Sequence, residues 1–261
     1  MTTAATPLKP RSRWPSYVLL AVMILIMLMT IGALFYTFSS NASPAASAAM
    51  QGSPQVQVAA GQFISFTPAG SAVDASKAST GFILYPGAFV NATAYALFAS
   101  AIAASGYPVF VTPVPLDLAL LNPNAAQVVI EANPQITNWV IGGHSLGGAM
   151  AGQFVAANPD AVSGLVLLGA YPNADLSGWD GVVSSVYGTA DGLATPAQVQ
   201  AAASVLPAGT TFVAIEGGNH AQFGDYGAQG GDNPATISAA EQLAQAAQAT
   251  LNVLNQVNAG N

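Results

Sequence analysis

The 261-residue sequence contains no cysteine. This absence excludes disulfides, thiolate catalysis and metal sites built on sulfur, and it leaves the cellular compartment to be inferred from other features. The length, once a short N-terminal stretch is set aside, fits one α/β domain with a substantial core.

Basic residues are almost as scarce. Lys9, Arg11 and Arg13 all precede the first apolar run, so Lys77 is the one basic residue that accompanies the eleven acidic residues of the remaining chain. With one basic and eleven acidic side chains, that remainder carries a formal charge of −10. This charge argues against binding of nucleic acid, or of an anionic membrane, through the surface of the domain.

Charge is missing altogether from residues 17–38. As a helix, this run would span roughly 33 Å, which is enough to cross a bilayer core. The basic residues before it predict a cytoplasmic segment 1–16, a single transmembrane helix 17–38 and an extracytoplasmic remainder. A flexible Ala/Ser/Pro linker is expected at 39–54, followed by the catalytic domain at 55–261. The alternative is a cleaved signal peptide, which would make the domain a secreted one.

Short apolar runs alternate with helix-like stretches along the domain, a pattern typical of a parallel sheet with crossover helices. The runs are nearly continuous, as in strands buried on both faces. The expected strands are residues 63–69, 81–87, 107–115, 139–145, 164–171, 182–188 and 211–218. The expected helices are residues 92–105, 124–132, 146–157, 196–205 and 234–256. The connection between residues 171 and 182 is too short for an inserted cap domain.

A G-x-S-x-G motif, Gly143-His144-Ser145-Leu146-Gly147, joins an expected strand to an expected helix. In a nucleophile elbow, a strand ends, a strained residue projects its side chain and a helix begins at once. Small neighbours are required because larger side chains would clash there. We therefore predict that Ser145 is a nucleophile; the alternative is an ordinary glycine-rich turn.

A serine hydroxyl becomes a good nucleophile only when a base takes its proton. The chain has two histidines. His144 lies inside the motif, where its side chain points away from that of its neighbour. His220 follows the last expected strand and is therefore the predicted base, with a solvated surface histidine as the alternative.

The base in turn needs a carboxylate that holds its imidazole in one tautomer. Asp191 directly follows the expected strand 182–188 and is the predicted acid. Glu216 is the second choice, and we expect Asp160, Asp175 and Asp180 to be surface groups.

Acyl transfer also requires N–H donors for the developing oxyanion. The N–H of Leu146 is the first predicted donor. The second comes from the loop after residues 81–85, where Pro86 has no N–H. Gly87 or Ala88 must therefore supply it, and Ala88 is favoured by position.

These blocks resemble the α/β-hydrolase superfamily, in particular its small lidless members related to dienelactone hydrolases, the type named alpha/beta hydrolase fold-5. The resemblance covers about residues 79–256 and is carried by GFILYPGA, VIGGHSLGGAMA, YGTADGLATP and IEGGNHAQFGDYG. It implies an eight-stranded, mostly parallel sheet with helices on both faces, and a triad of Ser145, Asp191 and His220. Dienelactone hydrolases use cysteine as nucleophile, so that particular activity is not supported.

We therefore expect a carboxylesterase-like serine hydrolase that acts on a small-molecule acyl or ester substrate through an acyl-enzyme on Ser145. No metal ion or organic cofactor is expected. Amide cleavage, acyl transfer to another acceptor and a catalytically inactive binding or scaffold role remain open alternatives.

Overall fold

The computed structural model describes residues 14–38 and 40–260. The chain divides into two units between positions 39 and 40. The first unit contains helix α1 (Trp14–Phe38). In neither described range does a helix reach the combination of length and hydropathy that crossing a membrane requires. The predicted transmembrane helix is thus not confirmed, and most of the predicted cytoplasmic segment 1–16 lies outside the described residues.

The second unit is built on an eight-stranded sheet with the order β1-β2-β4-β3-β5-β6-β7-β8. The strands are β1 (Val56–Ala60), β2 (Ile64–Pro68), β3 (Thr80–Tyr85), β4 (Val109–Val111), β5 (Asn138–His144), β6 (Gly164–Leu168), β7 (Val182–Gly188) and β8 (Thr211–Ile215). All neighbours from β4 to β8 pair in parallel, whereas β1 with β2 and β2 with β4 pair antiparallel. This is the eight-stranded, mostly parallel sheet that the resemblance implied.

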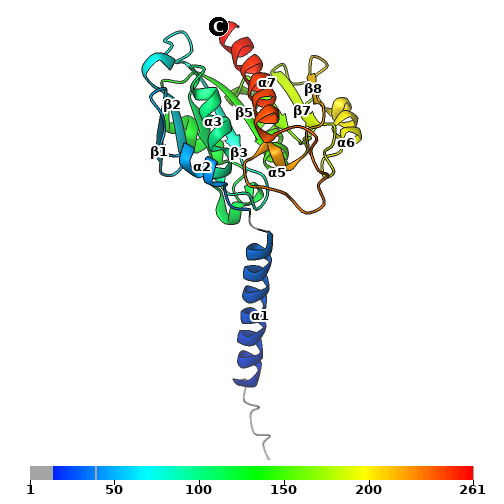
Figure 1. The fold of residues 1–261 in the computed structure, drawn as a ribbon. Helices are drawn as coiled ribbons and strands as arrows, with labels where there is room; N and C mark the ends of the chain where they lie inside the picture. The colour runs from blue at the N-terminus through cyan, green and yellow to red at the C-terminus, as the bar shows by residue number, and fades with distance from the viewer. Residues whose placement is uncertain (1–13, 39, 261) are drawn as a thin grey trace, which may run out of the picture. The chain divides into compact units, whose positions relative to one another are not determined.

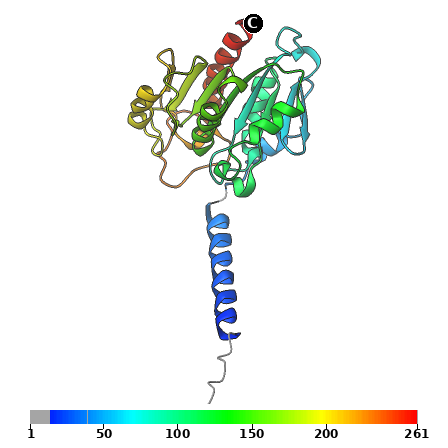
Figure 2. The ribbon, with the colours of Figure 1, turned by 180° about the vertical axis from the view of Figure 1, so that it is seen from behind.

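Helices cover both faces of this sheet because side chains alternate along each buried strand. The helices are α2 (Pro44–Ala49), α3 (Ala96–Ala103), α4 (Ala125–Ala132), α5 (Leu146–Ala157), α6 (Pro196–Ala201) and α7 (Ala239–Ala259). Phe82 and Leu84 of β3 pack in the core that contains α3 and α7, which lie in front of the sheet in Figure 1. Ile83 and Tyr85 pack in the opposite core with α4 and α5, on the face that Figure 2 turns to the viewer.

The segment before β1 differs from the predicted flexible linker. Ser40 forms a parallel bridge to Val90, and α2 follows with Ser43 as its N-cap. Ala46 of α2 is fully buried, and the hydroxyl of Ser43 donates to the carboxylate of Asp225. This Ala-rich segment forms a helix and not a flexible linker because it has a cap and a surface to pack on.

Two smaller differences concern element bounds. The expected helix 196–205 is split into α6 and a 3-10 turn, Ala202–Val205. The last helix begins at Ala239 rather than at residue 234, because Ser238 and Glu241 form a capping box. The connection from 169 to 181 contains only turns and bends, in agreement with the expected absence of a cap domain.

Candidate active site

Ser145 occupies a sharp turn at the carboxyl end of the parallel sheet. Strand β5 ends at His144 and helix α5 begins at Leu146, so the serine is the single residue between them. Its backbone angles are φ 53° and ψ −124°, a conformation that residues with a side chain rarely adopt. The strand, strained serine and helix are the geometry that defines a nucleophile elbow.

The glycines of the motif are required by space. A Cβ on Gly143 would lie 2.3 Å from the carbonyl carbon of Gly147. A Cβ on Gly147 would lie 2.2 Å from the carbonyl oxygen of Tyr85 in β3. Both distances are shorter than any non-bonded contact, which confirms the predicted need for small residues around the serine.

Asp191 and His220 lie in contact, although 29 positions separate them in the sequence. The Nδ1 atom of His220 is 2.8 Å from Oδ2 of Asp191, and both residues are buried. Because an ionised carboxylate can only accept, Nδ1 carries the proton and Nε2 of the neutral ring is left to accept one. The other oxygen of Asp191, Oδ1, accepts the N–H groups of Leu193 at 2.8 Å and Ala194 at 2.7 Å.

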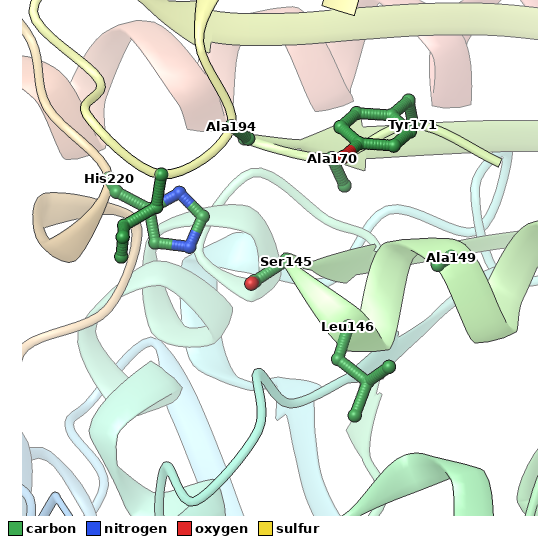
Figure 3. Close-up of a pocket in the computed structure, with 9 residues that line it drawn as sticks. Ser145, Leu146, Ala149, Ala170, Tyr171, Ala194 and His220 are labelled. Carbon is green, nitrogen blue, oxygen red and sulfur yellow. The ribbon is translucent and has the colours of Figure 1, made fainter. Parts of the chain in front are cut away.

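The hydroxyl of Ser145 points toward the imidazole of His220 (Figure 3). In the described part of the chain, these two side chains do not form a hydrogen bond. Catalytic hydrogen bonds of this kind are often long and shorten only when substrate is bound. The second-choice acid, Glu216, is exposed, and the carboxylate that contacts His220 is that of Asp191.

Ser145 and His220 line one cavity of about 290 Å³. Its wall is mostly apolar and contains no acidic or permanently charged side chain. The lining residues are Ser145, Leu146, Ala149, Gly169, Ala170, Tyr171, Leu193, Ala194 and His220. The cavity therefore offers contacts for a neutral, apolar group beside the serine.

His144, which the sequence argument set aside, is part of a buried hydrogen-bonded chain. The N–H of Gly87 donates to the hydroxyl oxygen of Tyr95 at 2.8 Å, and that oxygen is 2.9 Å from Nδ1 of His144. The hydroxyl of Tyr95, whose oxygen accepts the N–H of Gly87, can donate its own proton to Nδ1 of a neutral imidazole. Burial, together with the neighbouring His220, holds the pKa of His144 well below its ordinary value. His144 is therefore neutral.

The same chain corrects one predicted oxyanion donor. The single N–H proton of Gly87 is taken by Tyr95 and is not available to an oxyanion. The N–H of Ala88 donates to no described residue, and Leu146 stands at the first position of α5, where a helix N–H has no partner within the helix. Of the three predicted donors, Leu146 and Ala88 remain.

Sequence reasoning missed several residues that hold the site. Tyr95 contacts His144 across 49 positions. Gln242, fully buried in α7, binds both backbone groups of Asn219, next to His220: its Oε1 accepts the N–H at 2.9 Å and its amide donates to the carbonyl at 2.6 Å. Gln242 directly follows the capping box of Ser238 and Glu241, and that motif does not predict a side-chain contact with Asn219, so only the folded chain reveals it.

Residues 81–244 match the family model described as alpha/beta hydrolase family. No curated protein matches the chain.

Solved structures of three proteins share the fold. A predicted CIB-like hydrolase from Thermoplasma acidophilum is 16% identical, covers 76% of this chain and 98% of its own, and has a TM-score of 0.53. A thermophilic esterase from Thermogutta terrifontis is 13% identical, covers 78% of this chain and 94% of its own, and has a TM-score of 0.55. An alpha/beta hydrolase from the metagenome of lagoon sediments of Mar Chica, Morocco, is 16% identical, covers 66% of this chain and 91% of its own, and has a TM-score of 0.50. The family match spans more than half of the sequence, and the chain belongs to the alpha/beta hydrolase family.

Proposed function

We propose that this protein is a serine hydrolase that cleaves carboxylic esters through an acyl-enzyme on Ser145. The observation that carries the proposal is the strained Ser145, whose hydroxyl faces the imidazole of His220. Asp191 binds Nδ1 of the same imidazole at 2.8 Å. Family membership supports hydrolysis in general, and this arrangement supports a serine nucleophile in particular.

Each residue would have one role. His220 Nε2 takes the proton of Ser145 as the hydroxyl oxygen attacks the ester carbonyl carbon. Asp191 keeps the imidazole oriented and stabilises the imidazolium that forms. The N–H groups of Leu146 and Ala88 donate to the oxyanion, and loss of one such donor typically costs about a hundred- to a thousand-fold in turnover. His220 then protonates the leaving alcohol, and water activated by the same imidazole releases the acid.

The cavity favours a neutral acyl group. Leu146, Tyr171 and Leu193 provide apolar contact, while Ala149 and Ala170 leave room beside the serine. Small uncharged esters are therefore the proposed substrate class. Amide cleavage, or acyl transfer to an acceptor other than water, would use the same residues and forms the second candidate.

Labelling by a fluorophosphonate, together with hydrolysis of a short-chain nitrophenyl ester, tests the proposal. The unmodified protein should label and turn over, whereas Ser145→Ala should do neither and His220→Ala should lose at least about a thousand-fold in kcat. Ser204→Ala, which removes an exposed serine elsewhere, is the matched control and should keep full activity. A folded unmodified protein that neither labels nor hydrolyses would overturn the proposal in favour of a binding or scaffold role.

The location of the protein is a separate proposal that rests on the sequence alone. The basic residues before position 14 and the uncharged run 17–38 favour a single-pass membrane anchor with the catalytic domain outside the cytoplasm. Alkaline extraction of membranes, followed by protease treatment of intact cells, tests this. Recovery of the full-length chain in the soluble cytoplasmic fraction would contradict it.

A further inference from the structure

Asp232 lies in the connection between β8 and α7, which also carries His220. Its carboxylate binds the His220 end of this connection and the loop that follows β7. Oδ2 accepts the N–H of Ala221, the residue after His220, at 2.9 Å. Oδ1 accepts the N–H of Gly192, the residue after Asp191, at 3.0 Å. One carboxylate thus receives the N–H that directly follows each member of the Asp191–His220 pair.

The loops are tightly packed at this point. A Cβ on Gly192 would lie 2.9 Å from the carbonyl oxygen of Gly231 and 3.0 Å from the backbone nitrogen of Asn233. Oδ1 of Asp232 also accepts the N–H of Asn233 at 2.9 Å, which orients the carboxylate itself. Hydrogen bonds to an ionised acceptor are shorter and stronger than neutral ones, so this carboxylate is well suited to join two loops.

We propose that Asp232 is a positioning residue that holds the loops of Asp191 and His220 in register, so that the imidazole is aimed at Ser145. The inference rests on the proposed hydrolase function. Asp232 is not among the residues that line the cavity, so it acts through the backbone of the two loops and not on the substrate. Displacement of a catalytic group by about 1 Å can cost about a hundred-fold in rate.

Two substitutions of Asp232 should lower kcat to different extents. Asp232→Asn keeps one acceptor oxygen, but its NH₂ group cannot accept, so one of the two loops loses its bond. Asp232→Ala removes both bonds. We expect kcat to fall by about tenfold in the first variant and about a hundred-fold in the second, with KM for a nitrophenyl ester changed by less than about twofold.

Asp175→Asn is the matched control. Its carboxylate also accepts a backbone N–H, from Ser177 at 2.9 Å, but within its own turn. This variant loses the same charge, while its amide oxygen can still accept the N–H of Ser177, and no contact between two loops is involved. Its kcat should stay within about twofold of that of the unmodified protein.

The decisive comparison repeats Asp232→Asn in the His220→Ala background, with a fluorogenic ester that measures the residual rate. If Asp232 acts through His220, its substitution should cost less than about twofold there. The same tenfold loss in both backgrounds would reveal a general structural role and overturn the proposal. Full activity of Asp232→Ala in the presence of His220 would also overturn it.

Thermal unfolding and fluorophosphonate labelling separate the remaining outcomes. A folded Asp232→Asn variant that labels slowly supports the proposal, whereas one with a lowered Tm and an unchanged labelling rate contradicts it. If the unmodified protein itself fails to label, the proposed function has failed. If it labels and depends on Ser145 while both Asp232 variants are fully active, the inference about Asp232 alone has failed.

Discussion

At the level of one residue, the proposed function of Ser145 conflicts with stability. Its φ of 53° is unfavourable for any residue with a Cβ, and such strain costs about 1–3 kcal/mol. The elbow nevertheless projects the hydroxyl out of the turn toward His220. The surrounding packing of β5 against α5 must therefore hold the strained conformation in place.

Comparison of Ser145→Gly with Ser145→Ala measures this strain. Both variants lose the proposed nucleophile, but only glycine removes the Cβ that makes the conformation unfavourable. Even after the extra chain entropy that glycine loses on folding, we expect Ser145→Gly to be more stable than Ser145→Ala by about 1 kcal/mol. Chemical denaturation of both variants gives the difference, and equal stabilities would show that the backbone is not strained.

The buried, neutral imidazole of His144 makes the stability of the folded protein depend on pH. Its pKa in the folded protein lies well below the ordinary histidine value of 6.5, mainly because burial disfavours the charged form. Below pH 6.5 the unfolded chain therefore binds a proton that the folded protein does not. This contribution is fully present above that pH and is lost as the pH falls toward the lowered pKa, by at most about 1.4 kcal/mol per pH unit.

The substitution His144→Asn tests this assignment. The amide oxygen of asparagine can replace Nδ1 as acceptor for Tyr95, but it does not titrate in this range. Denaturation between pH 7.5 and pH 5 should show a smaller loss of stability in the variant than in the unmodified protein. Parallel curves for the two proteins would mean that His144 binds a proton equally well folded and unfolded.

At the level of elements, the segment 40–49 is part of the folded domain. Ser40 pairs with the loop that follows β3, donating to Phe89 at 2.7 Å and accepting from Asn91 at 3.1 Å. Ser43 caps α2 and also bonds to Asp225, in the loop that carries His220. The segment therefore contacts both loops beside the site.

A double-mutant cycle measures how strongly Ser43 and Asp225 interact. Loss of an N-cap typically costs about 1 kcal/mol, and Ser43→Ala also removes the hydroxyl's bond to the Asp225 carboxylate while keeping the backbone bond, so about 1–2 kcal/mol is expected. The coupling energy between Ser43→Ala and Asp225→Ala should be about 1 kcal/mol. Ser53→Ala is the control, because the hydroxyl oxygen of Ser53 accepts the N–H of Gln55, within its own turn. Additive effects of Ser43→Ala and Asp225→Ala would show that the two residues do not interact.

The elements that could be predicted are those with a strong local pattern. Helix α5 was predicted at its observed bounds because a strand, a glycine-rich motif and an apolar stretch follow one another. Strand β1 was missed because it is an edge strand in which only Val56 is buried. Helix α2 was missed because its stability comes from Ala46 packing on a distant part of the chain, which no local pattern shows.

The residues of the candidate site likewise fall into those that sequence order predicts and those that it does not. Ser145, Asp191 and His220 could be proposed from their order after successive strands, because the carboxyl ends of parallel strands meet at one edge. The contacts of Asp232, Tyr95 and Gln242 could not, since each joins positions that no sequence spacing relates. The hydrogen bond from the N–H of Gly87 to the hydroxyl oxygen of Tyr95 was missed for the same reason.

At the scale of the whole molecule, charge predicts which substrates are excluded. Residues after position 16 carry eleven acidic side chains and one basic side chain, and no cationic side chain lines the cavity to attract an anion. The field of the domain therefore repels negatively charged substrates, while neutral ones approach without steering. Such effects on encounter rates weaken as salt shortens the range of the field.

A pair of nitrophenyl esters of equal length, one with a neutral acyl chain and one ending in a carboxylate, tests this expectation. At low ionic strength, kcat/KM for the neutral ester should exceed that for the anionic ester by at least about tenfold. The ratio should fall as NaCl is raised to about 0.5 M, because the shorter Debye length weakens repulsion of the anion alone. The neutral ester serves as the internal control, since its own kcat/KM should stay constant. A preference for the anionic ester would mean that a binding group for carboxylate exists near the site, and the proposed substrate class would have to be abandoned.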